Sequence, residues 1–117
     1  MIIIAGYLEF ADQDGRDRVV AASHDLQQAT RDDEAGCLAY VFAADPCDGR
    51  KVQIYERWAD EASLAAHFQH PNYTGMREVL GQAERTGGDI LKHRVDLSEP
   101  VYDDTRTARA DFFTATD

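Results

Sequence analysis

The chain contains little cysteine. Only two cysteines, Cys37 and Cys47, occur among its 117 residues, and their spacing matches neither a C-x-x-C motif nor a zinc-ligand pattern. Cys37 falls in a predicted strand and Cys47 in the turn after it, and an extended chain between them would separate them by roughly 30 Å. That separation is too long for a disulfide. We therefore expect two free thiols and no resident metal.

Basic residues are also scarce. Twelve Lys and Arg stand against 22 Asp and Glu, which gives a net charge of −10 at pH 7. Nucleic-acid binding needs Lys and Arg concentrated on one surface, and no basic stripe occurs along this chain. The excess of acid is more simply explained by solubility. We therefore expect no nucleic-acid partner.

Long apolar runs are absent as well. No stretch approaches the roughly 20 apolar residues of a membrane span. The apolar start at residues 1–4 has no basic flank, is too short for a secretory signal, and is soon followed by Glu9. With 44% apolar residues and mixed charge, the composition indicates one globular domain. We expect a cytoplasmic protein with no membrane partner.

Hydrophobic periodicity divides the chain into strands and helices. Alternating or nearly continuous apolar residues predict strands, whereas apolar residues three or four apart predict helices. Pro71 fits the first turn of a new helix, and Gly87-Gly88 is expected to end that helix. The predicted strands are Ile2–Phe10, Cys37–Ala44, Lys51–Trp58 and 90–97 (extending at most to 102), and the predicted helices cover 14–33 and 60–83.

This strand-helix-strand-strand-helix-strand order predicts an α+β, ferredoxin-like βαββαβ fold with a four-stranded antiparallel sheet. The two helices cover one face of such a sheet. The first three strands carry apolar residues on both sides, with Leu38, Tyr40 and Phe42 on one face of the second, so the other face also needs a cover. A second copy of the chain is the simplest cover, and we predict a homodimer. The domain is expected to span residues 1–102, and the tail 103–117 is expected to be flexible or to clasp the partner.

Three motifs resemble the antibiotic biosynthesis monooxygenase family of dimeric α+β barrel proteins. Residues 34–38 read EAGCL, like the E-P-G-C-L that leads into the second strand of that family. Residues 56–58 read ERW and precede a helix containing A-A-H-F at 65–68, similar to the family's E-x-W strand end and A-H-L helix. Asn72 departs from the usual pattern, since the family has a histidine there. The resemblance covers about residues 1–102.

The resemblance implies either of two activities. Some members oxidise phenols, hydroquinones or anthrones with O2 alone, without metal or flavin, and others degrade haem. The first reaction requires a substrate anion, because triplet oxygen accepts one electron at a time, so the protein must deprotonate its substrate in a dry pocket. On the second helix, His67 is the candidate base, and Tyr73 with Arg77 could neutralise a phenolate.

Apolar and aromatic side chains are expected to hold the substrate ring. The candidate binding residues are Tyr7, Tyr40, Phe42, Trp58, Phe68 and Met76. Structural roles compete with these assignments: Trp58 is also a natural core residue, and Glu56 is expected to anchor a helix or the dimer. His70 lies three residues after His67 and could share a metal with it, but no third ligand is evident.

Haem degradation is disfavoured by the residues at the corresponding positions. Members of that branch share an Asn on strand one, a Trp on helix two and, later in the chain, a His that is an axial haem ligand. The corresponding positions here hold Tyr7, His67 and Arg77, so none of the three matches. Arginine is not a haem ligand. The leading hypothesis is a cofactor-independent monooxygenase that acts on a small aromatic, phenolic or quinol-type substrate. The alternatives are a non-catalytic small-molecule binder or degenerate family member, and an isomerase or lyase.

Overall fold

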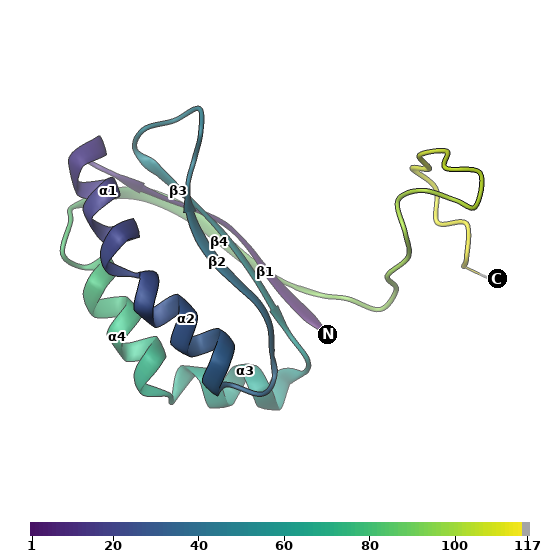
Figure 1. Cartoon of the computed structure of the whole chain (residues 1–117), viewed down its shortest axis with the longest axis horizontal. Coiled ribbons are helices and arrows are strands. Elements are labelled where there is room, and N and C mark those ends of the chain that lie inside the picture. The colour runs from purple at the N-terminus through teal and green to yellow at the C-terminus, as the bar shows by residue number, and fades with distance from the viewer. Residues whose placement is uncertain (116–117) are drawn as a thin grey trace.

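The computed structural model describes residues 1–115, and within them four strands form one antiparallel sheet (Figure 1). The strands are β1 (Ile2–Phe10), β2 (Cys37–Ala44), β3 (Lys51–Trp58) and β4 (Arg85–Arg94). Their order in the sheet is β2-β3-β1-β4, and every neighbouring pair is antiparallel. This order confirms the predicted ferredoxin-like α+β fold.

All helices lie on one face of the sheet (Figure 1). They are α1 (Gln13–Ala22), α2 (His24–Asp33), α3 (Glu61–Phe68) and α4 (Pro71–Leu80). The single helix predicted over 14–33 is wrong, because Ser23 separates two helices. The Ser23 hydroxyl donates to the Val20 carbonyl at 2.7 Å, and a serine that bonds to backbone in this way competes with regular helix geometry. No helix in the described part of the chain has the length and apolar character that crossing a bilayer requires.

The last strand begins earlier than its sequence pattern predicts. α4 ends at Leu80 rather than near 83, and β4 starts at Arg85 and contains Gly87 and Gly88. These glycines therefore do not act as a helix stop. A Cβ on Gly88 would lie 3.0 Å from the Tyr7 carbonyl oxygen, so a residue without a side chain lets β4 approach β1 closely here.

The core lies between the helices and the sheet. β3 alternates as predicted, with Val52, Ile54, Glu56 and Trp58 all buried on the helix side. Leu38 departs from the pattern: it was expected beside Tyr40 and Phe42, but half of its surface is exposed. The β2–β3 register shifts between Cys37 and Ala39, and such an irregularity re-aims the side chain within it.

The second face of the sheet is apolar as well, and no helix within residues 1–115 covers it. Ile3, Ala5 and Tyr7 of β1 point to this side, opposite the buried residues of the same strand. Tyr55 of β3 and Leu91 of β4, which both pair with Ala5, are 40% and 56% exposed. We refer to these five residues as the open face.

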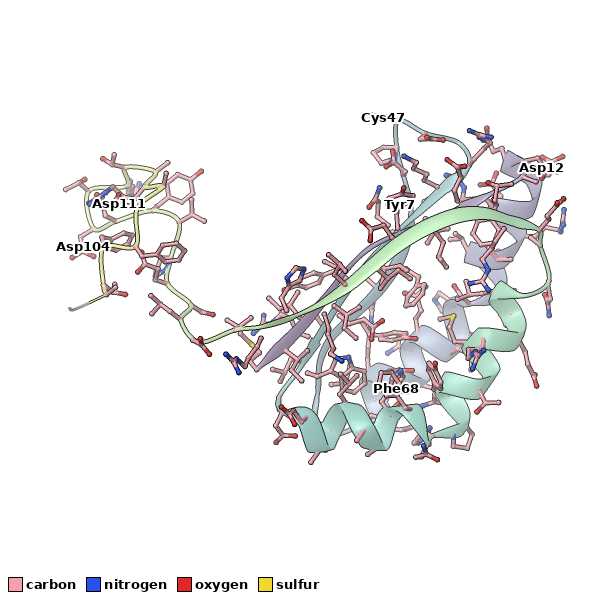
Figure 2. All side chains as sticks on the ribbon, turned by 180° about the vertical axis from the view of Figure 1, so that it is seen from behind. Tyr7, Asp12, Cys47, Phe68, Asp104 and Asp111 are labelled. Atoms are coloured by element: carbon pink, nitrogen blue, oxygen red, sulfur yellow. The ribbon has the colours of Figure 1, made fainter. Side chains whose placement is uncertain are left out.

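The described part of the tail extends away from the sheet and folds back on itself (Figure 2, near Asp104 and Asp111). Asp103 accepts hydrogen bonds from the backbone N–H groups of Thr105 and Thr107 at 2.9 and 3.1 Å. Glu99 accepts one from Phe113 N at 3.0 Å. The tail is therefore organised by its own polar contacts rather than by packing on the sheet.

Substitution of Gly6 is expected to destabilise the fold. Its φ angle is +154°, and a Cβ at this position would overlap the Asp89 carbonyl and the Ile90 Cα of β4. We expect Gly6→Ala to lower the free energy of unfolding by roughly 3 kcal/mol or more, since backbone strain and a steric clash coincide. Urea denaturation measures this change.

Gly87→Ala is the matched control on the same strand pair. An added Cβ at Gly87 meets only Glu9 Oε1, at an ordinary 4.0 Å. We expect that variant to retain its stability within about 1 kcal/mol. Equal stability losses in the two variants would show that the close approach at Gly6 is not what constrains this strand pair.

Candidate functional site

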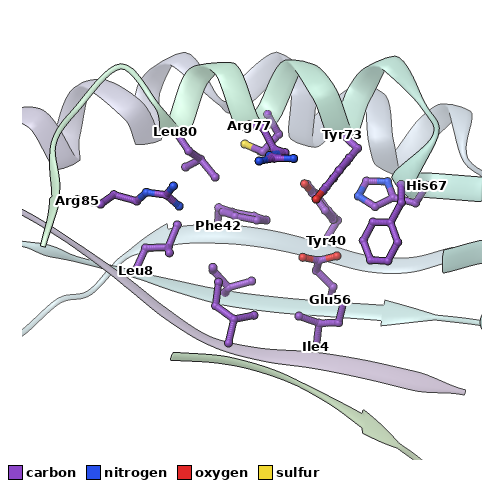
Figure 3. A pocket seen from close by; sticks show the side chains of 14 residues that line it. Ile4, Leu8, Tyr40, Phe42, Glu56, His67, Tyr73, Arg77, Leu80 and Arg85 are labelled. Atoms are coloured by element: carbon purple, nitrogen blue, oxygen red, sulfur yellow. The ribbon is translucent and has the colours of Figure 1, made fainter. Parts of the chain in front are cut away.

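A cavity of about 280 Å³ lies between the sheet and helices α3 and α4 (Figure 3). Most of its wall is apolar, and several polar side chains enter it. The lining residues are Ile4, Leu8, Tyr40, Phe42, Ile54, Glu56, His67, Phe68, Tyr73, Met76, Arg77, Leu80, Arg85 and Ile90. A concave apolar pocket with a few converging polar groups is the usual form of a small-molecule site.

His67 is the most constrained polar side chain of the cavity. Only 2% of its surface is exposed, and its Nδ1 lies 2.8 Å from Glu34 Oε1. A carboxylate only accepts hydrogen bonds, so Nδ1 carries the proton and the neutral ring keeps its lone pair on Nε2. Burial lowers the pKa of His67, and this effect outweighs the opposing influence of Glu34. His67 is thus a neutral imidazole near pH 7.

Local sequence features hold Glu34 against His67. Gly36 packs directly on Ser63, with no room for a Cβ, so the loop after α2 touches the start of α3. His70 Nδ1 accepts the Asn72 N–H at 3.0 Å, which begins α4 at Pro71. Asn72 Nδ2 then donates to Glu34 Oε2 at 3.2 Å. The asparagine that departs from the family pattern therefore helps to fix the carboxylate.

Glu56 is a second buried acid and enters the same cavity. It is 7% exposed, and its Oε1 accepts the indole N–H of Trp58 at 2.9 Å. Burial raises the pKa of Glu56 to about 7, the charge of Glu34 adds to this, and the Trp58 hydrogen bond opposes it. Glu56 therefore exchanges a proton near neutral pH instead of acting only as a structural anchor.

Two tyrosines and an arginine complete the polar lining around His67. The rings of Tyr40 and Tyr73 lie 5.5 and 5.4 Å from the imidazole, centroid to centroid. Burial raises the pKa of Tyr40, and nearby carboxylates raise it further, so this phenol stays protonated and can donate. Arg77 Cζ lies 5.8 Å from the Tyr73 ring centroid. The structure therefore places His67, Tyr73 and Arg77, the three predicted catalytic residues, in the lining of one cavity.

The predicted substrate-binding residues divide into three groups. Tyr40, Phe42, Phe68 and Met76 line the cavity. Trp58 is fully buried behind His67, with its ring centroid 4.4 Å from the imidazole, so it supports the site from the core and does not line the cavity. Tyr7 does not belong to the cavity, because strand alternation places it on the open face, where Lys51 Nζ lies 4.5 Å from its ring centroid (Figure 2).

Sequence reasoning missed Glu34, Glu56 and Arg85 as site residues. The signal for Glu56 was present, because a carboxylate stood between Ile54 and Trp58 on the strand face predicted to be buried. Glu34 entered the sequence analysis only as the first residue of the EAGCL motif at 34–38, with no functional role assigned to it. No group of three or more His, Cys, Asp or Glu within residues 1–115 is arranged to hold a metal ion, and both Cys37 and Cys47 are free thiols.

Comparison with known proteins identifies the family. The sequence profile of the antibiotic biosynthesis monooxygenase family matches residues 1–79. An uncharacterised protein of Synechocystis is 29% identical over 72 residues, which are 62% of this chain and 48% of that protein. The chain thus spans about half the length of this curated relative.

Solved structures share the fold at low sequence identity. A Deinococcus radiodurans protein, provisionally described as an antibiotic biosynthesis monooxygenase, has a TM-score of 0.72 at 23% identity, covering 86% of this chain and 97% of that one. A Caulobacter crescentus protein with the same provisional description has a TM-score of 0.72 at 17% identity, covering 84% and 90%. These likenesses show the fold, and the profile match over residues 1–79 shows that the chain belongs to the antibiotic biosynthesis monooxygenase family.

Proposed function

We propose that this protein oxidises a small phenolic or quinol-type substrate with O2, without a metal or organic cofactor. One observation carries the proposal. Glu34 holds His67 Nδ1 at 2.8 Å, so the imidazole presents an unprotonated Nε2 within a largely apolar cavity. A buried neutral base beside an aromatic-lined cavity is what proton removal from a phenol requires.

The chemistry follows from the substrate anion. His67 takes the phenolic proton, and the electron-rich phenolate transfers one electron to O2 to give a radical pair. Recombination forms a C–O bond at the ring carbon para to the oxygen, and loss of water from the resulting hydroperoxide leaves a quinone. The balance is phenol plus O2 to quinone plus water. A hydroquinone already carries oxygen at the para carbon, so no C–O bond forms; it gives a second electron and its protons to the reduced oxygen, and the balance is hydroquinone plus O2 to quinone plus hydrogen peroxide. Tyr40 and Tyr73 would donate hydrogen bonds to developing oxyanions, and Glu56 would return a proton to the leaving oxygen.

The size of the cavity limits the substrate. Its volume of about 280 Å³ lies just below the range of roughly 300–1,000 Å³ for small-molecule sites. A substrate of one or two rings fits such a space, whereas a long fused polycycle would have to extend through the mouth. The apolar walls formed by Phe42 and Met76 suit the flat faces of an aromatic ring.

Oxygen consumption with a panel of hydroquinones, naphthols and anthrones tests the proposal. We expect one O2 per quinone formed, with no loss of rate after chelator treatment. Tyr73→Phe is expected to lower kcat about tenfold, because it removes one donor to the substrate oxyanion. Tyr7→Phe, on the open face, is the control and should leave the rate unchanged. Tight binding without O2 uptake would instead identify a small-molecule binder.

We also propose that the protein works as a homodimer that buries the open face. Ile3, Tyr7, Tyr55 and Leu91 offer apolar surface there, and an exposed apolar face of this kind favours self-association. The tail carries Tyr102 and Phe112 at 61% and 65% exposure, and we propose that it packs on the partner subunit.

Sedimentation velocity tests the dimer and the tail separately. We expect twice the chain mass for the intact protein and a monomer for Leu91→Asp, because a charge buried in the interface without a partner is costly. Removal of residues 103–117 is expected to weaken the dimer. A monomer at high concentration would contradict the interface, and an unchanged dimer after truncation would rule out an essential clasp.

A further inference from the structure

The cavity has a polar end and a cationic end. His67, Tyr73 and Glu56 lie toward one end, and Arg85 approaches from the other, beside Leu8 and Leu80 (Figure 3). Arg77 lies on α4 between Tyr73 and Leu80. Arg85 therefore stands at the end of the cavity away from the proposed base, and Arg77 lies between the two ends, next to Tyr73 (Figure 3).

Neither arginine has an anionic partner within the described chain. No carboxylate of residues 1–115 forms an ion pair or a side-chain hydrogen bond with Arg77 or Arg85, although the chain carries 22 acidic residues against 12 basic ones. Other arginines of the domain do find acids: Arg16 pairs with Asp17 at 2.8 Å, and Arg50 lies 3.7 Å from Glu9. Four more arginines of the described chain are without such a pair, but none of them lines the cavity: Arg18, Arg31, Arg57 and Arg106.

A neighbouring ring positions one of the two cations. Arg77 lies over the Tyr73 ring with Cζ 5.8 Å from its centroid, a cation–π contact that leaves the N–H groups free for another partner. Arg85 is the first residue of β4, so a strand fixes its backbone. Two arginines at the rim of an apolar cavity match a planar carboxylate, which accepts paired N–H donors.

We propose that the substrate is a hydroxylated aromatic carboxylic acid, bound with its carboxylate at Arg77 and Arg85 and its hydroxyl group toward His67 and Glu56. This inference rests on the proposed function for the identity of the reacting group. The carboxylate anchors the ring, so that the hydroxyl oxygen is presented to the base in one orientation. The negative charge of the substrate also compensates two cations that the chain itself leaves unpaired.

Matched ligands under anaerobic conditions test this recognition apart from turnover. The probes are 2,5-dihydroxybenzoate, its neutral amide and unsubstituted hydroquinone, with the corresponding 1,4-dihydroxy-2-naphthoate series for a two-ring scaffold. Isothermal titration calorimetry is expected to show the acid of at least one scaffold binding about tenfold or more tightly than its amide. Arg77→Gln and Arg85→Gln should each remove most of that preference, whereas Arg18→Gln should leave it intact.

The outcomes separate this inference from the proposed oxidation. Equal binding of acid and amide, no binding of any acid, or a preference that survives both cavity arginine substitutions would overturn carboxylate recognition. Oxygen uptake with neutral hydroquinones alone would leave the oxidation standing while contradicting the inference. Selective binding of an acid that depends on both arginines, without O2 uptake in air, would support the recognition and contradict the oxidation.

Discussion

Replacing His67 with alanine is expected to reduce O2 consumption by about 100-fold or more, the usual contribution of a positioned general base. The substitution removes an imidazole that lines the cavity and leaves the Glu34 carboxylate without its 2.8 Å partner. Initial rates under saturating substrate measure the loss. The effect should appear in kcat, since the substitution leaves in place the aromatic walls that we propose hold the ring.

Chemical rescue separates the base from a structural role. The space vacated in His67→Ala is expected to admit free imidazole. The added imidazole should restore part of the rate, in proportion to the concentration of its unprotonated form. His24→Ala is the matched control, because that histidine of α2 is exposed, does not line the cavity, and has its Nδ1 3.0 Å from Asp25 Oδ1. A folded His67→Ala protein with the original rate would show that another group removes the proton.

The lowered pKa of His67 also determines the acid side of the pH profile. Burial holds the pKa below its ordinary value of 6.5, so more than half of the folded protein has a neutral imidazole at pH 6.5, and the ring gains its proton as the pH falls further. The same shift makes folding weaker in acid, because the unfolded state binds this proton more readily than the folded state. Both activity and this contribution to stability should therefore be retained at pH 6.5 and lost below it.

Glu56→Gln is expected to stabilise the protein above pH 7 by up to about 3 kcal/mol. Burial raises the pKa of Glu56 from an ordinary 4.5 to about 7 in the folded state. Below pH 4.5 the acid is protonated in both states and contributes nothing. Between pH 4.5 and 7 the unfolded state ionises first, so the wild type loses stability as the pH rises. Glutamine carries no charge and keeps an oxygen to accept the Trp58 indole N–H at any pH.

Urea denaturation at pH 4.5 and pH 8 measures the difference. The two proteins should have similar stability at pH 4.5, and the variant should be the more stable at pH 8 while being slower in turnover. Glu78→Gln is the control, because that side chain lies exposed on α4. A variant that is less stable than the wild type at pH 8 would mean that the folded state favours the ionised carboxylate, contrary to its burial.

The fold could be predicted because its signals are local and agree with one another. The alternation from Val52 to Trp58 fixed the buried face of β3, and the order of elements fixed the topology. The errors arose where one side chain or one contact between strands decides the outcome. Apolar spacing predicted one helix over 14–33, but the Ser23 hydroxyl bonds to backbone and two helices form instead. Gly88 was predicted to end a helix, but it lies in β4, where it lets that strand approach Tyr7 closely.

The candidate site was predicted less completely, for a physical reason. His67, Tyr73 and Arg77 share a short region of sequence, so helical spacing brings them together. Glu34 reaches His67 across 33 residues, through a loop that packs on Ser63, and no periodic pattern reports such a contact. Tyr7 was misplaced because an aromatic residue on a strand buried on both faces gives no indication of which face it occupies.

The state of the His67 imidazole tests the central claim most directly. Nitrogen-15 NMR of histidine-labelled protein distinguishes the two ring nitrogens and follows their protonation through a pH titration. We expect a neutral ring at pH 7, with the proton on Nδ1, an unprotonated Nε2, and a pKa below 6.5. A ring that is charged at pH 7, or that carries its proton on Nε2, would contradict the assignment of this nitrogen as the base.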